Sequence, residues 1–575
     1  MPLVADLFSR HDTSSLTPAQ LAENDVDPYE ETPKYARGVV YFVCGFMALF
    51  VGARFVLSLR RRFAPIFTKS GFYRRVIAAS RYLATKQQKV LGVHFPTLGV
   101  SLVIFAFFAF TMIWTWGTLP YYRSAWNVGG SPLAMRSGLM ALGCFPFIMA
   151  FSAKWNFVTF ITGHSHEKLQ VYHQFMSHIF LILSLIHSFP WLVQGMAEVK
   201  PGFEPMTQIE WSWHVAHKVY YWSGAALLII LAWLCWASLP FFRNRFYESF
   251  KYLHVISALL FTAFFFIHCN RLLGSWDYLY ATVVIYGASV VCRFGWMLYT
   301  NSSGMPRASF ELMPAGMVKL RVACNPLEVW QPGQHYFFHF LTVAPFESHP
   351  FTIASIPKLE TDEPQELVVL IRSANGLTKR LSKYLAKHDG AKTIPVLLDG
   401  PFGGVGQDLS IYEHVLLVVG GTGVTFITPI LQDLVRKSNL GETVCKSVHV
   451  VWSVRDEESL SWMINEIQGT ARKAIRTSIT IQIHVTGNDR NQTTSDSDSD
   501  SKIKESSSSP TYGRADISSV VRAAGAETRT LGVAVCGPGS LLYDVRNAVA
   551  GLQRDIALGK PGCNEVYLHS EEYAW

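Results

Sequence analysis

The sequence predicts a bundle of membrane-spanning helices followed by a soluble α/β region. Half of the 575 residues are hydrophobic and only 16% are charged, whereas soluble domains average about 25% charged residues. Seven long apolar segments precede residue 299, and short apolar runs separated by Gly and Pro turns follow it. These observations disfavour a wholly soluble, a disordered and a nucleic-acid-coating protein. The nine cysteines have no clustered spacing, so they indicate neither a disulfide framework nor a zinc site.

The apolar segments have lengths close to the ~20 residues that a helix needs to cross a ~30 Å hydrocarbon core. The third segment is short. The first lacks the basic start and the cleavage site of a signal peptide, so we expect it to span the membrane. The expected spans are residues 38–59, 97–119, 137–153, 169–193, 219–239, 252–269 and 278–298.

The loop between the first two spans predicts the orientation of the chain. Residues 60–89 contain nine Lys and Arg and no acid, and cytoplasmic loops carry an excess of Lys and Arg. Alternation then places residues 241–251 and everything after 298 in the cytoplasm, and the polar, acidic tail at 1–37 outside. The alternative, that the basic loop only binds anionic lipid, predicts the same side.

Four histidines in the fourth and sixth segments have a matched spacing. His173 and His187 are 14 residues apart, as are His254 and His268. Fourteen residues fall about 40° short of four helical turns and rise ~21 Å, so each pair shares one face and spans the membrane. Facing imidazoles are good haem ligands in an apolar bundle. We therefore expect His173 and His254 to hold an inner haem iron, and His187 and His268 an outer one.

Other roles for these histidines are less consistent with the spacing. A single membrane histidine often bonds a neighbouring helix, but two pairs at identical spacing disfavour that explanation. A nonhaem metal site is weaker still, because ~21 Å separates the two levels. His178 lies ~140° around the helix from His173, so we expect it to be structural.

Two short motifs and a helix start lie in the first part of the soluble region. His349-Pro350-Phe351-Thr352 and the segment Asp399-Gly-Pro-Phe-Gly403 are expected to form loops after strands at 335–341 and 367–371. Between them, residues 375–380 are expected to begin a helix whose N-terminal amides favour a pyrophosphate. Its candidate contributors are Arg372, Gly376, Thr378 and Lys379.

A nucleotide-binding pattern follows. Residues 415–419 predict a strand, Gly420-Gly421-Thr422-Gly423 a turn, and the apolar run from Phe426 a helix. Glycines let the backbone approach a phosphate, although the full GxGxxG pattern is absent. A second strand at 448–454 ends at Arg455, which is placed for the 2′-phosphate of NADPH. The alternative is a surface arginine paired with Glu457.

A third strand, at 531–535, runs into Cys536-Gly537. Cys536 is either close to a nicotinamide or a small buried packing residue, and the sequence does not separate the two. Residues 488–510 form a run rich in Ser and Asp with almost nothing apolar to bury, so we expect a disordered insertion.

With these motifs in this order, residues 97–575 resemble the fungal ferric reductase family of the ferric reductase–NADPH oxidase superfamily. The resemblance implies a haem-bearing transmembrane domain at 38–298. It also implies a ferredoxin–NADP reductase-like module, with an antiparallel β-barrel FAD domain at 305–405 and an α/β NADPH domain at 412–575. Many members carry a long secreted N-terminal region, whereas this chain has a short acidic tail.

The resemblance also implies roles for individual residues. His349, Pro350, Phe351 and Thr352 would lie along FAD, with Phe351 against the isoalloxazine. Gly420, Gly421, Thr422 and Gly423 would meet the NADPH phosphates, and Cys536 and Gly537 the nicotinamide. Trp575 would cover the flavin, the alternative being a buried structural tryptophan at a chain end.

The implied function is a transmembrane ferric-chelate reductase that supports iron uptake. Electrons would pass from cytoplasmic NADPH through FAD and two b-type haems to Fe(III) or Cu(II) chelates on the opposite face, with no catalytic acid–base residue needed. The expected location is the plasma membrane, or alternatively the vacuolar membrane, in contact with lipid and without nucleic acid. An iron permease or oxidase partner leaves no mark in the sequence.

Two other functions share these motifs. An NADPH oxidase would use the same relay with dioxygen as acceptor, but the equal 14-residue spacing in both helices resembles the reductases. A haem sensor without turnover is disfavoured, because it has no need of flavin and nicotinamide sites.

Overall fold

The computed structural model describes residues 18, 29–62, 70–122, 131–197, 219–302, 304–324, 330–358, 365–388, 393–487 and 510–572. They form two compact units, which are described separately. The first contains Met1–Ser58 and Leu102–Arg293, and the second contains Leu59–Ser101 and Phe294–Trp575. The expected insertion at 488–510 lies outside the described residues except for Pro510, and so does most of the N-terminal tail.

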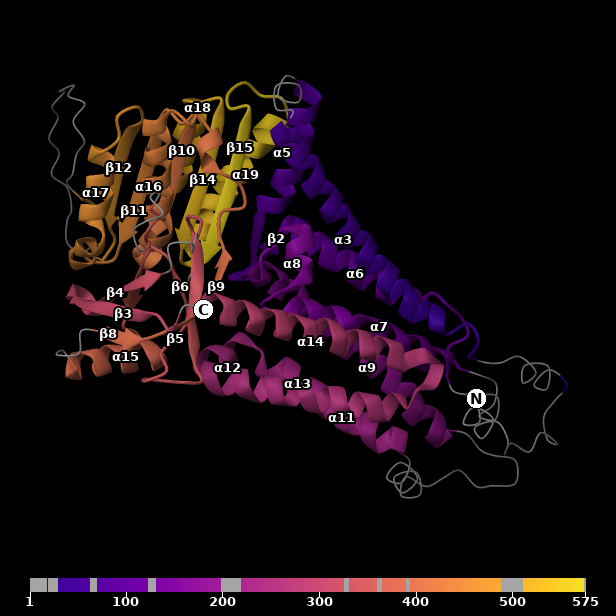
Figure 1. Cartoon of the computed structure of the whole chain (residues 1–575). Helices are drawn as coiled ribbons and strands as arrows, with labels where there is room; N and C mark the ends of the chain where they lie inside the picture. Colours follow the sequence, from indigo (N-terminus) through magenta and orange to yellow (C-terminus); the bar gives the residue numbers. More distant parts are fainter. Residues whose placement is uncertain are drawn as a thin grey trace. The chain divides into compact units, whose positions relative to one another are not determined.

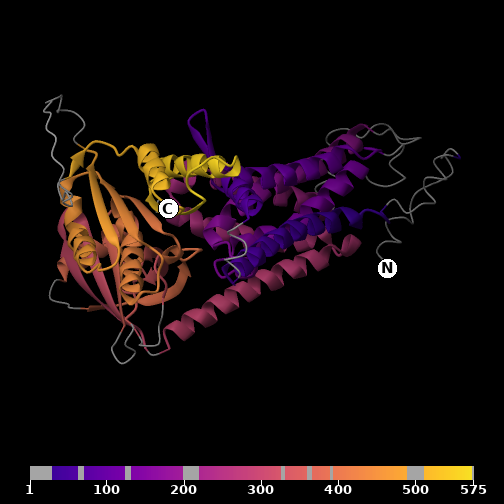
Figure 2. The ribbon, with the colours of Figure 1, turned by 90° about the horizontal axis from the view of Figure 1, so that it is seen from above.

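Seven helices are long and apolar enough to cross a membrane, which confirms the predicted spans. The third begins earlier than expected, because Ser131 caps it and Pro132 starts its first turn. The last, drawn rose in Figure 2, is continuous across the boundary of the two units. The seven are α3 (Pro33–Arg62), α6 (Leu98–Trp116), α7 (Pro132–Ser152), α9 (His166–Ala197), α11 (Val219–Ala237), α13 (Tyr247–Cys269) and α14 (Ser275–Thr300).

Helix α7 forms the centre of the first unit. About 78% of its apolar window is buried, against 28% or less in the other six candidate spans. Its Gly143 lies so close to α3 that an added Cβ would stand 2.7 Å from the carbonyl oxygen of Ala36. Two short helices, α8 (Phe157–Thr162) and α12 (Pro240–Arg245), lie in the connections. The central helix thus holds its neighbours at close backbone distance.

Two antiparallel sheets around one apolar core begin the second unit. A four-stranded sheet has the order β7-β4-β3-β8 and a three-stranded sheet the order β6-β5-β9. Helix α15 (Gly376–Lys387) starts after Asn375, where a helix was expected. The strands are β3 (Arg307–Met313), β4 (Met317–Cys324), β5 (Gln334–His339), β6 (Ser348–Thr352), β7 (Gln365–Arg372), β8 (Thr393–Pro395) and β9 (Leu397–Gly403).

The expectation that the motifs at 349–352 and 399–403 are loops is wrong. The first lies in β6 and the second in β9. Both strands are at the edges of the three-stranded sheet, with β5 between them. An edge strand tolerates proline because one side of its backbone needs no partner. Pro350 pairs in register with Phe337, whereas the pairing of β9 with β5 shifts register between Asp399 and Phe402, where Pro401 lies.

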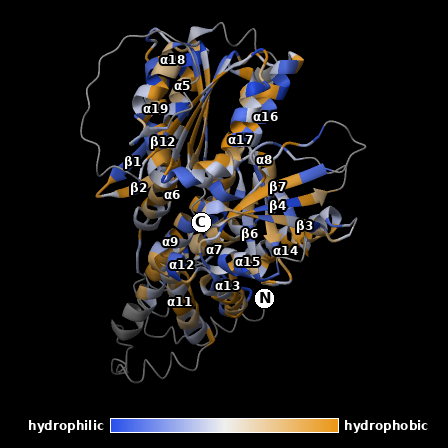
Figure 3. Ribbon diagram, turned by 90° about the vertical axis from the view of Figure 1, so that its left-hand side faces the viewer, coloured by the Kyte–Doolittle hydropathy of each residue, from blue (hydrophilic) through white to orange (hydrophobic). Residues whose placement is uncertain are grey.

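A parallel six-stranded sheet of order β13-β12-β11-β10-β14-β15 completes the second unit. Its central strands carry mostly apolar residues, orange in Figure 3, because helices cover both faces. The strands are β10 (His414–Gly420), β11 (Ser447–Val454), β12 (Ser478–Val485), β13 (Thr511–Tyr512), β14 (Thr530–Gly537) and β15 (Glu565–Glu572). The helices are α16 (Val424–Leu440), α17 (Ile464–Arg472), α18 (Ile517–Ala526) and α19 (Gly539–Ala557).

Part of the basic loop between the first two membrane helices packs on this sheet domain. Helix α5 (Gly71–Thr85) lies beside α19 (Figures 1 and 3), and the hairpin β1 (Gln87–Val90) and β2 (Val93–Thr97) follows it. Arg81 Nη1 donates to Glu565 Oε1 at 3.0 Å and to the carbonyl oxygen of Val566 at 2.9 Å. Arg74 donates to Asn564. These basic residues therefore hold α5 against the C-terminal strand.

Candidate functional site: paired histidines and a nucleotide crevice

The first unit brings the four spaced histidines together as two pairs. The ring centroids of His173 and His254 lie 6.4 Å apart, and those of His187 and His268 lie 6.1 Å apart. Each pair joins α9 to α13, as the matched spacing predicts. The bundle therefore offers two separate levels at which facing imidazoles meet.

Hydrogen bonds fix how three of these rings present their nitrogens. Nδ1 of His173 lies 2.9 Å from the carbonyl oxygen of Ile148, and Nδ1 of His187 lies 2.7 Å from that of Ala134. Nδ1 of His268 lies 3.0 Å from the carbonyl oxygen of Tyr220. A carbonyl only accepts, so Nδ1 carries the proton and a neutral ring leaves Nε2 as a lone-pair donor. This arrangement fits a haem iron ligand held by its second nitrogen.

The fourth ring, His254, has its Nδ1 3.4 Å from the hydroxyl oxygen of Ser238. His178 has its Nδ1 bonded to the carbonyl oxygen of Gln174 in its own helix and is exposed. That placement agrees with the structural role expected for it. His166 lies 3.0 Å from Glu167 Oε1 and takes no part in either pair.

Two glycines that the sequence analysis did not single out make room for the outer pair. A Cβ added at Gly138 would stand 2.4 Å from Nδ1 of His187, and one at Gly224 would stand 2.9 Å from Cε1 of His268. Both distances are too short for real contacts, so these positions require glycine. Nothing in the sequence distinguishes them from other glycines in apolar helices.

An aromatic cluster occupies the bundle between the two histidine levels. Phe180 is seven residues from both His173 and His187, and Phe261 is likewise midway between His254 and His268. Their rings lie 5.8 Å apart, and Phe145 and Phe265 join them at 5.3–6.2 Å. The space between the two pairs is therefore filled with rings and excludes water.

The motif at 349–352, which was expected to lie along FAD, is on β6, paired with β5. Phe351 contacts Phe338 and Phe340 with ring centroids 5.8 and 6.4 Å apart, and remains half-buried. His349 and Pro350 are also half-buried, and Thr352 lies opposite His335. Phe351 thus packs on the core, while every side chain of this strand remains partly accessible to solvent or to a ligand.

The sequence analysis did not predict a second group of aromatic side chains on the same sheet. His335, Phe337 and Phe402 contact one another with ring centroids 5.5–6.2 Å apart. Phe402 belongs to the motif on β9, and the two others belong to β5 between the motifs. An alternating aromatic strand beside the first motif was the signal that would have found them.

The expected pyrophosphate contributors lie around the start of α15. Arg372 ends β7, and Arg372 and Lys379 are both exposed. Gly376 has φ +54°, a conformation that favours glycine. The Thr378 hydroxyl accepts from the backbone N–H of Ala374 at 3.1 Å and donates to the carbonyl oxygen of Asn375 at 2.9 Å. Thr378 therefore shapes the turn, while the two cations remain available for a phosphate.

The glycine turn lies at the C-terminal end of β10, where the strand order reverses toward β14. Such a switch point is where nucleotides bind in open α/β sheets. A Cβ at Gly423 would stand 2.6 Å from the carbonyl oxygen of Cys536, and one at Gly420 would stand 2.8 Å from Pro538. Gly421 has φ +53°. Gly420 and Gly423 therefore let this turn approach the turn at 536–538.

Two of the remaining candidates flank this turn. Arg455 is exposed directly after β11 and forms no ion pair with a described residue, while Glu457 bonds the hydroxyl of Tyr512. The alternative of an Arg455–Glu457 pair is thus not seen. Cys536 is buried, which raises the pKa of its thiol. Trp575 lies outside the described residues.

Acidic and imidazole groups from β15 also reach this edge and were missed. Cys536 is paired in register with Glu571, and His569 Nε2 lies 2.8 Å from Glu571 Oε1. The His569 ring stacks on Phe426 with centroids 5.6 Å apart. The sequence offered no signal, because β15 becomes a neighbour of β14 only in the folded sheet.

Paired histidines in a bundle of apolar helices, followed by an antiparallel domain and a parallel sheet with a glycine turn, define a class of membrane proteins that carry a nucleotide-binding module. Family models match the ferric reductase like transmembrane component at 137–265, an FAD-binding domain at 302–405 and the ferric reductase NAD binding domain at 412–550. FAD- and NAD(P)H-binding domains are thus present, and the transmembrane domain is haem-binding in this family. The predicted fold class is confirmed, while closure of the barrel stays a prediction.

Curated relatives narrow the class. The ferric/cupric reductase transmembrane component 7 of Saccharomyces cerevisiae (strain YJM789) is 31% identical over 466 residues, 77% of this chain and 72% of that protein. The probable cell surface ferric reductase kap2 of Aspergillus oryzae is 33% identical over 392 residues, 66% of this chain. The chain belongs to the fungal ferric reductase family. It spans about half the length of kap2, 51%.

A solved structure was also similar in part. A ferredoxin NADP+ reductase from Neisseria gonorrhoeae with bound FAD and NADP matches 46% of this chain and 97% of its own, with 11% identity and a TM-score of 0.33.

Proposed function

We propose that this protein is an NADPH-dependent reductase that carries electrons across a membrane to Fe(III) or Cu(II) chelates. The observation that carries the proposal is the pair of histidine levels in one bundle, in a chain that also holds FAD- and NAD-binding domains. The relatives named above are themselves described as ferric or ferric/cupric reductases.

The four paired histidines would hold two haem irons through Nε2. The bound flavin and haems supply the conversion of a two-electron donor into single-electron transfer. The backbone carbonyls of Ile148, Ala134 and Tyr220 orient three of the rings. Phe180 and Phe261 keep water out of the space between the levels.

Residues of the second unit would bind the two nucleotides. Gly420 to Gly423 form the turn that would receive the NADPH phosphates, and Arg455 would pair with the 2′-phosphate. Cys536 stays a neutral thiol at neutral pH because burial raises its pKa, so it would wall the nicotinamide side beside Gly537 without acting as a nucleophile.

The FAD side would use the motif on β6 and the start of α15. His349, Pro350, Phe351 and Thr352 would lie along the flavin, and Trp575 would cover it. Arg372 and Lys379, with the N-terminal amides near Gly376, would hold the pyrophosphate.

The proposed orientation follows from the basic loop. Residues 1–37 would lie outside and the second unit in the cytoplasm, in the plasma membrane or alternatively the vacuolar membrane. The reduced metal would then form on the outer face, where an iron permease or an oxidase would take it up.

One experiment tests the function and separates it from an NADPH oxidase. Membranes that contain the protein receive NADPH and an Fe(III) chelate under air, and Fe(II) trapping and superoxide are measured together. We expect Fe(II) in excess, and loss of both haem absorbance and reduction in His173→Ala or His254→Ala. The control, His178→Ala, should retain both. Reduction that survives either ligand change contradicts the relay, and superoxide without Fe(II) identifies an oxidase.

A further inference from the structure

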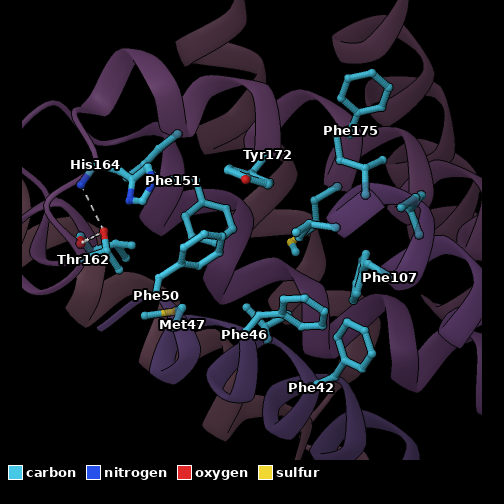
Figure 4. A pocket seen from close by; sticks show the side chains of 17 residues that line it. Phe42, Phe46, Met47, Phe50, Phe107, Phe151, Thr162, His164, Tyr172 and Phe175 are labelled. Carbon is cyan, nitrogen blue, oxygen red and sulfur yellow. Dashed lines mark hydrogen bonds between the residues drawn. The ribbon is translucent and has the colours of Figure 1, made fainter. Parts of the chain in front are cut away.

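An apolar groove in the first unit lies outside the histidine pairs. It is lined by side chains from α3, α6, α8 and α9, together with Phe151 of α7. Figure 4 shows Phe42 and Phe107 at one end, and His164 and Thr162 at the other. Phe175, 37% exposed, lies on its wall, so hydrocarbon of the membrane has access from that side.

The polar atoms of the lining are few. The Thr162 hydroxyl donates to the carbonyl oxygen of Val158 at 2.6 Å and accepts from the N–H of His164 at 3.3 Å, so it is satisfied. Tyr172 contributes the other hydroxyl, and His164 contributes the ring that closes this end. An occupant must therefore be apolar along most of its length.

Positive charge gathers at the His164 end. Arg54 donates to the carbonyl oxygens of Phe160 and Ile161 at 2.6 and 3.2 Å, which fixes its guanidinium at the C-terminus of α8. Lys168 is exposed, and neither cation forms an ion pair with a described residue. Glu167, which precedes Lys168 in the sequence, lies 3.0 Å from His166 through its Oε1.

The ring of His164 responds to both cations. It packs edge-on against Phe50 with centroids 5.1 Å apart. Burial lowers its pKa, and the charges of Lys168 and Arg54 lower it further. His164 is therefore neutral at neutral pH, and the charge at this end comes from Arg54 and Lys168.

We propose that this groove binds one phospholipid with an anionic head group. Its acyl chain would lie between α3, α6 and α9, and its head group against Arg54 and Lys168. Charge complementarity identifies the occupant, because an uncharged lipid, a sterol or a quinone would supply no anionic partner for Arg54 and Lys168 among the described residues. On the proposed orientation this end faces the cytoplasmic leaflet, where anionic lipids are concentrated; binding itself does not depend on that orientation.

The head-group contact is tested with the full-length protein in nanodiscs of phosphatidylcholine, with and without phosphatidylserine. We expect phosphatidylserine to be retained through purification, detected by native mass spectrometry, and to raise the unfolding temperature. Lys168→Gln should lower the affinity for phosphatidylserine roughly fivefold, as expected for one cation near an anionic surface. The matched control, Arg245→Gln, removes an exposed cation outside the groove and should change nothing.

The acyl-chain contact is tested by filling the groove. Ile104 lines the groove, whereas its neighbour Phe105 on α6 is 66% exposed and does not. Ile104→Trp should abolish retention of phosphatidylserine, while Phe105→Trp should leave it intact. Arg54 also caps α8, so Arg54→Gln could lower lipid binding by disturbing that helix. A loss of binding in Arg54→Gln therefore supports the proposal only if Lys168→Gln shows a loss as well.

Two results would overturn the proposal. One is equal retention of phosphatidylcholine and phosphatidylserine that Lys168→Gln does not change, which describes ordinary boundary lipid. The other is phosphatidylserine binding that Ile104→Trp leaves unaltered. Neither result bears on the reductase function, whose haem spectra and Fe(II) trapping are measured independently.

Discussion

A single residue, Gly138, determines the orientation of the His187 ring in the outer histidine pair. His187 bonds the carbonyl oxygen of Ala134 across a gap that exists because residue 138 has no side chain. Ring orientation through the second nitrogen is what tunes a metal-binding histidine. Gly138 is therefore as much a part of the proposed haem site as His187, the proposed iron ligand.

We expect Gly138→Ala to weaken the outer haem selectively. The new Cβ would stand 2.4 Å from Nδ1 of His187, so the ring must turn away from its carbonyl partner, and haem affinity should fall roughly 10- to 100-fold. Haem content and reduced-minus-oxidised spectra measure the effect. Gly45→Ala, with nothing within 4 Å of its added Cβ, is the control, and equal haem loss in both would contradict the argument.

Arg455 is expected to select the donor. A hydrogen bond to a charged group contributes about 1.5–3 kcal/mol, so Arg455→Gln should lower kcat/KM for NADPH roughly 10- to 150-fold while leaving NADH unchanged. Steady-state kinetics with both donors give the ratio. Arg472→Gln, an exposed arginine at the end of α17, should keep the preference; an unchanged ratio in Arg455→Gln would remove the proposed 2′-phosphate contact.

The sequence analysis used the cations of α5 only to predict the orientation of the chain in the membrane. In the structure, Arg74 and Arg81 of this helix instead form hydrogen bonds with residues of the nucleotide-binding domain. Ala78 of the same helix is buried in the core that contains Val418 and Val545. The helix thus completes a hydrophobic face and holds it with paired charges.

Arg81→Ala should destabilise the second unit by about 2 kcal/mol, because it removes a charged hydrogen bond to Glu565 and one to a backbone carbonyl. That loss corresponds to a fall of roughly 3 °C in the unfolding midpoint of a unit of this size, Leu59–Ser101 with Phe294–Trp575. Thermal unfolding of the full-length protein measures it. Lys89→Ala removes an exposed charge that has no partner among the described residues, and an equal fall there would show that only net charge matters.

The sequence predicted those elements that depend on local composition or on a regular spacing of residues. The seven helices follow from run length against membrane thickness, and β10, β11 and β14 from apolar runs that are covered on both faces. The histidine pairs follow from spacing alone. The motifs on β6 and β9 were misassigned, because Pro and Gly mark loops except at the edge of a sheet, and edges are known only from the topology.

What could not be predicted depends on contacts between distant segments. Arg74 and Asn564 are separated by 490 residues, and Gly423 meets Cys536 only because β10 and β14 are neighbours. Glu571 and His569 become candidates for the same reason.

At the scale of the whole molecule, the second unit should not be separable at the membrane boundary. A fragment of residues 294–575 lacks α5 and exposes the apolar surface that covers Ala78. We expect this fragment to aggregate or to unfold at lower temperature, and the addition of residues 70–101 to restore a monomer. Size-exclusion chromatography and thermal unfolding compare the two; equal behaviour would show that α5 is dispensable.

The docking of α5 also sets an order of events during synthesis. The ribosome makes Arg74 490 residues before its partner Asn564, an interval of roughly 25 to 100 s at ~5–20 residues per second. On the proposed orientation, the helix stays in the cytoplasm without its partner throughout that time, while six further apolar segments are inserted. The positive charge of α5 keeps the helix soluble during this interval. The interval ends when its partners Asn564 and Glu565 have been synthesised.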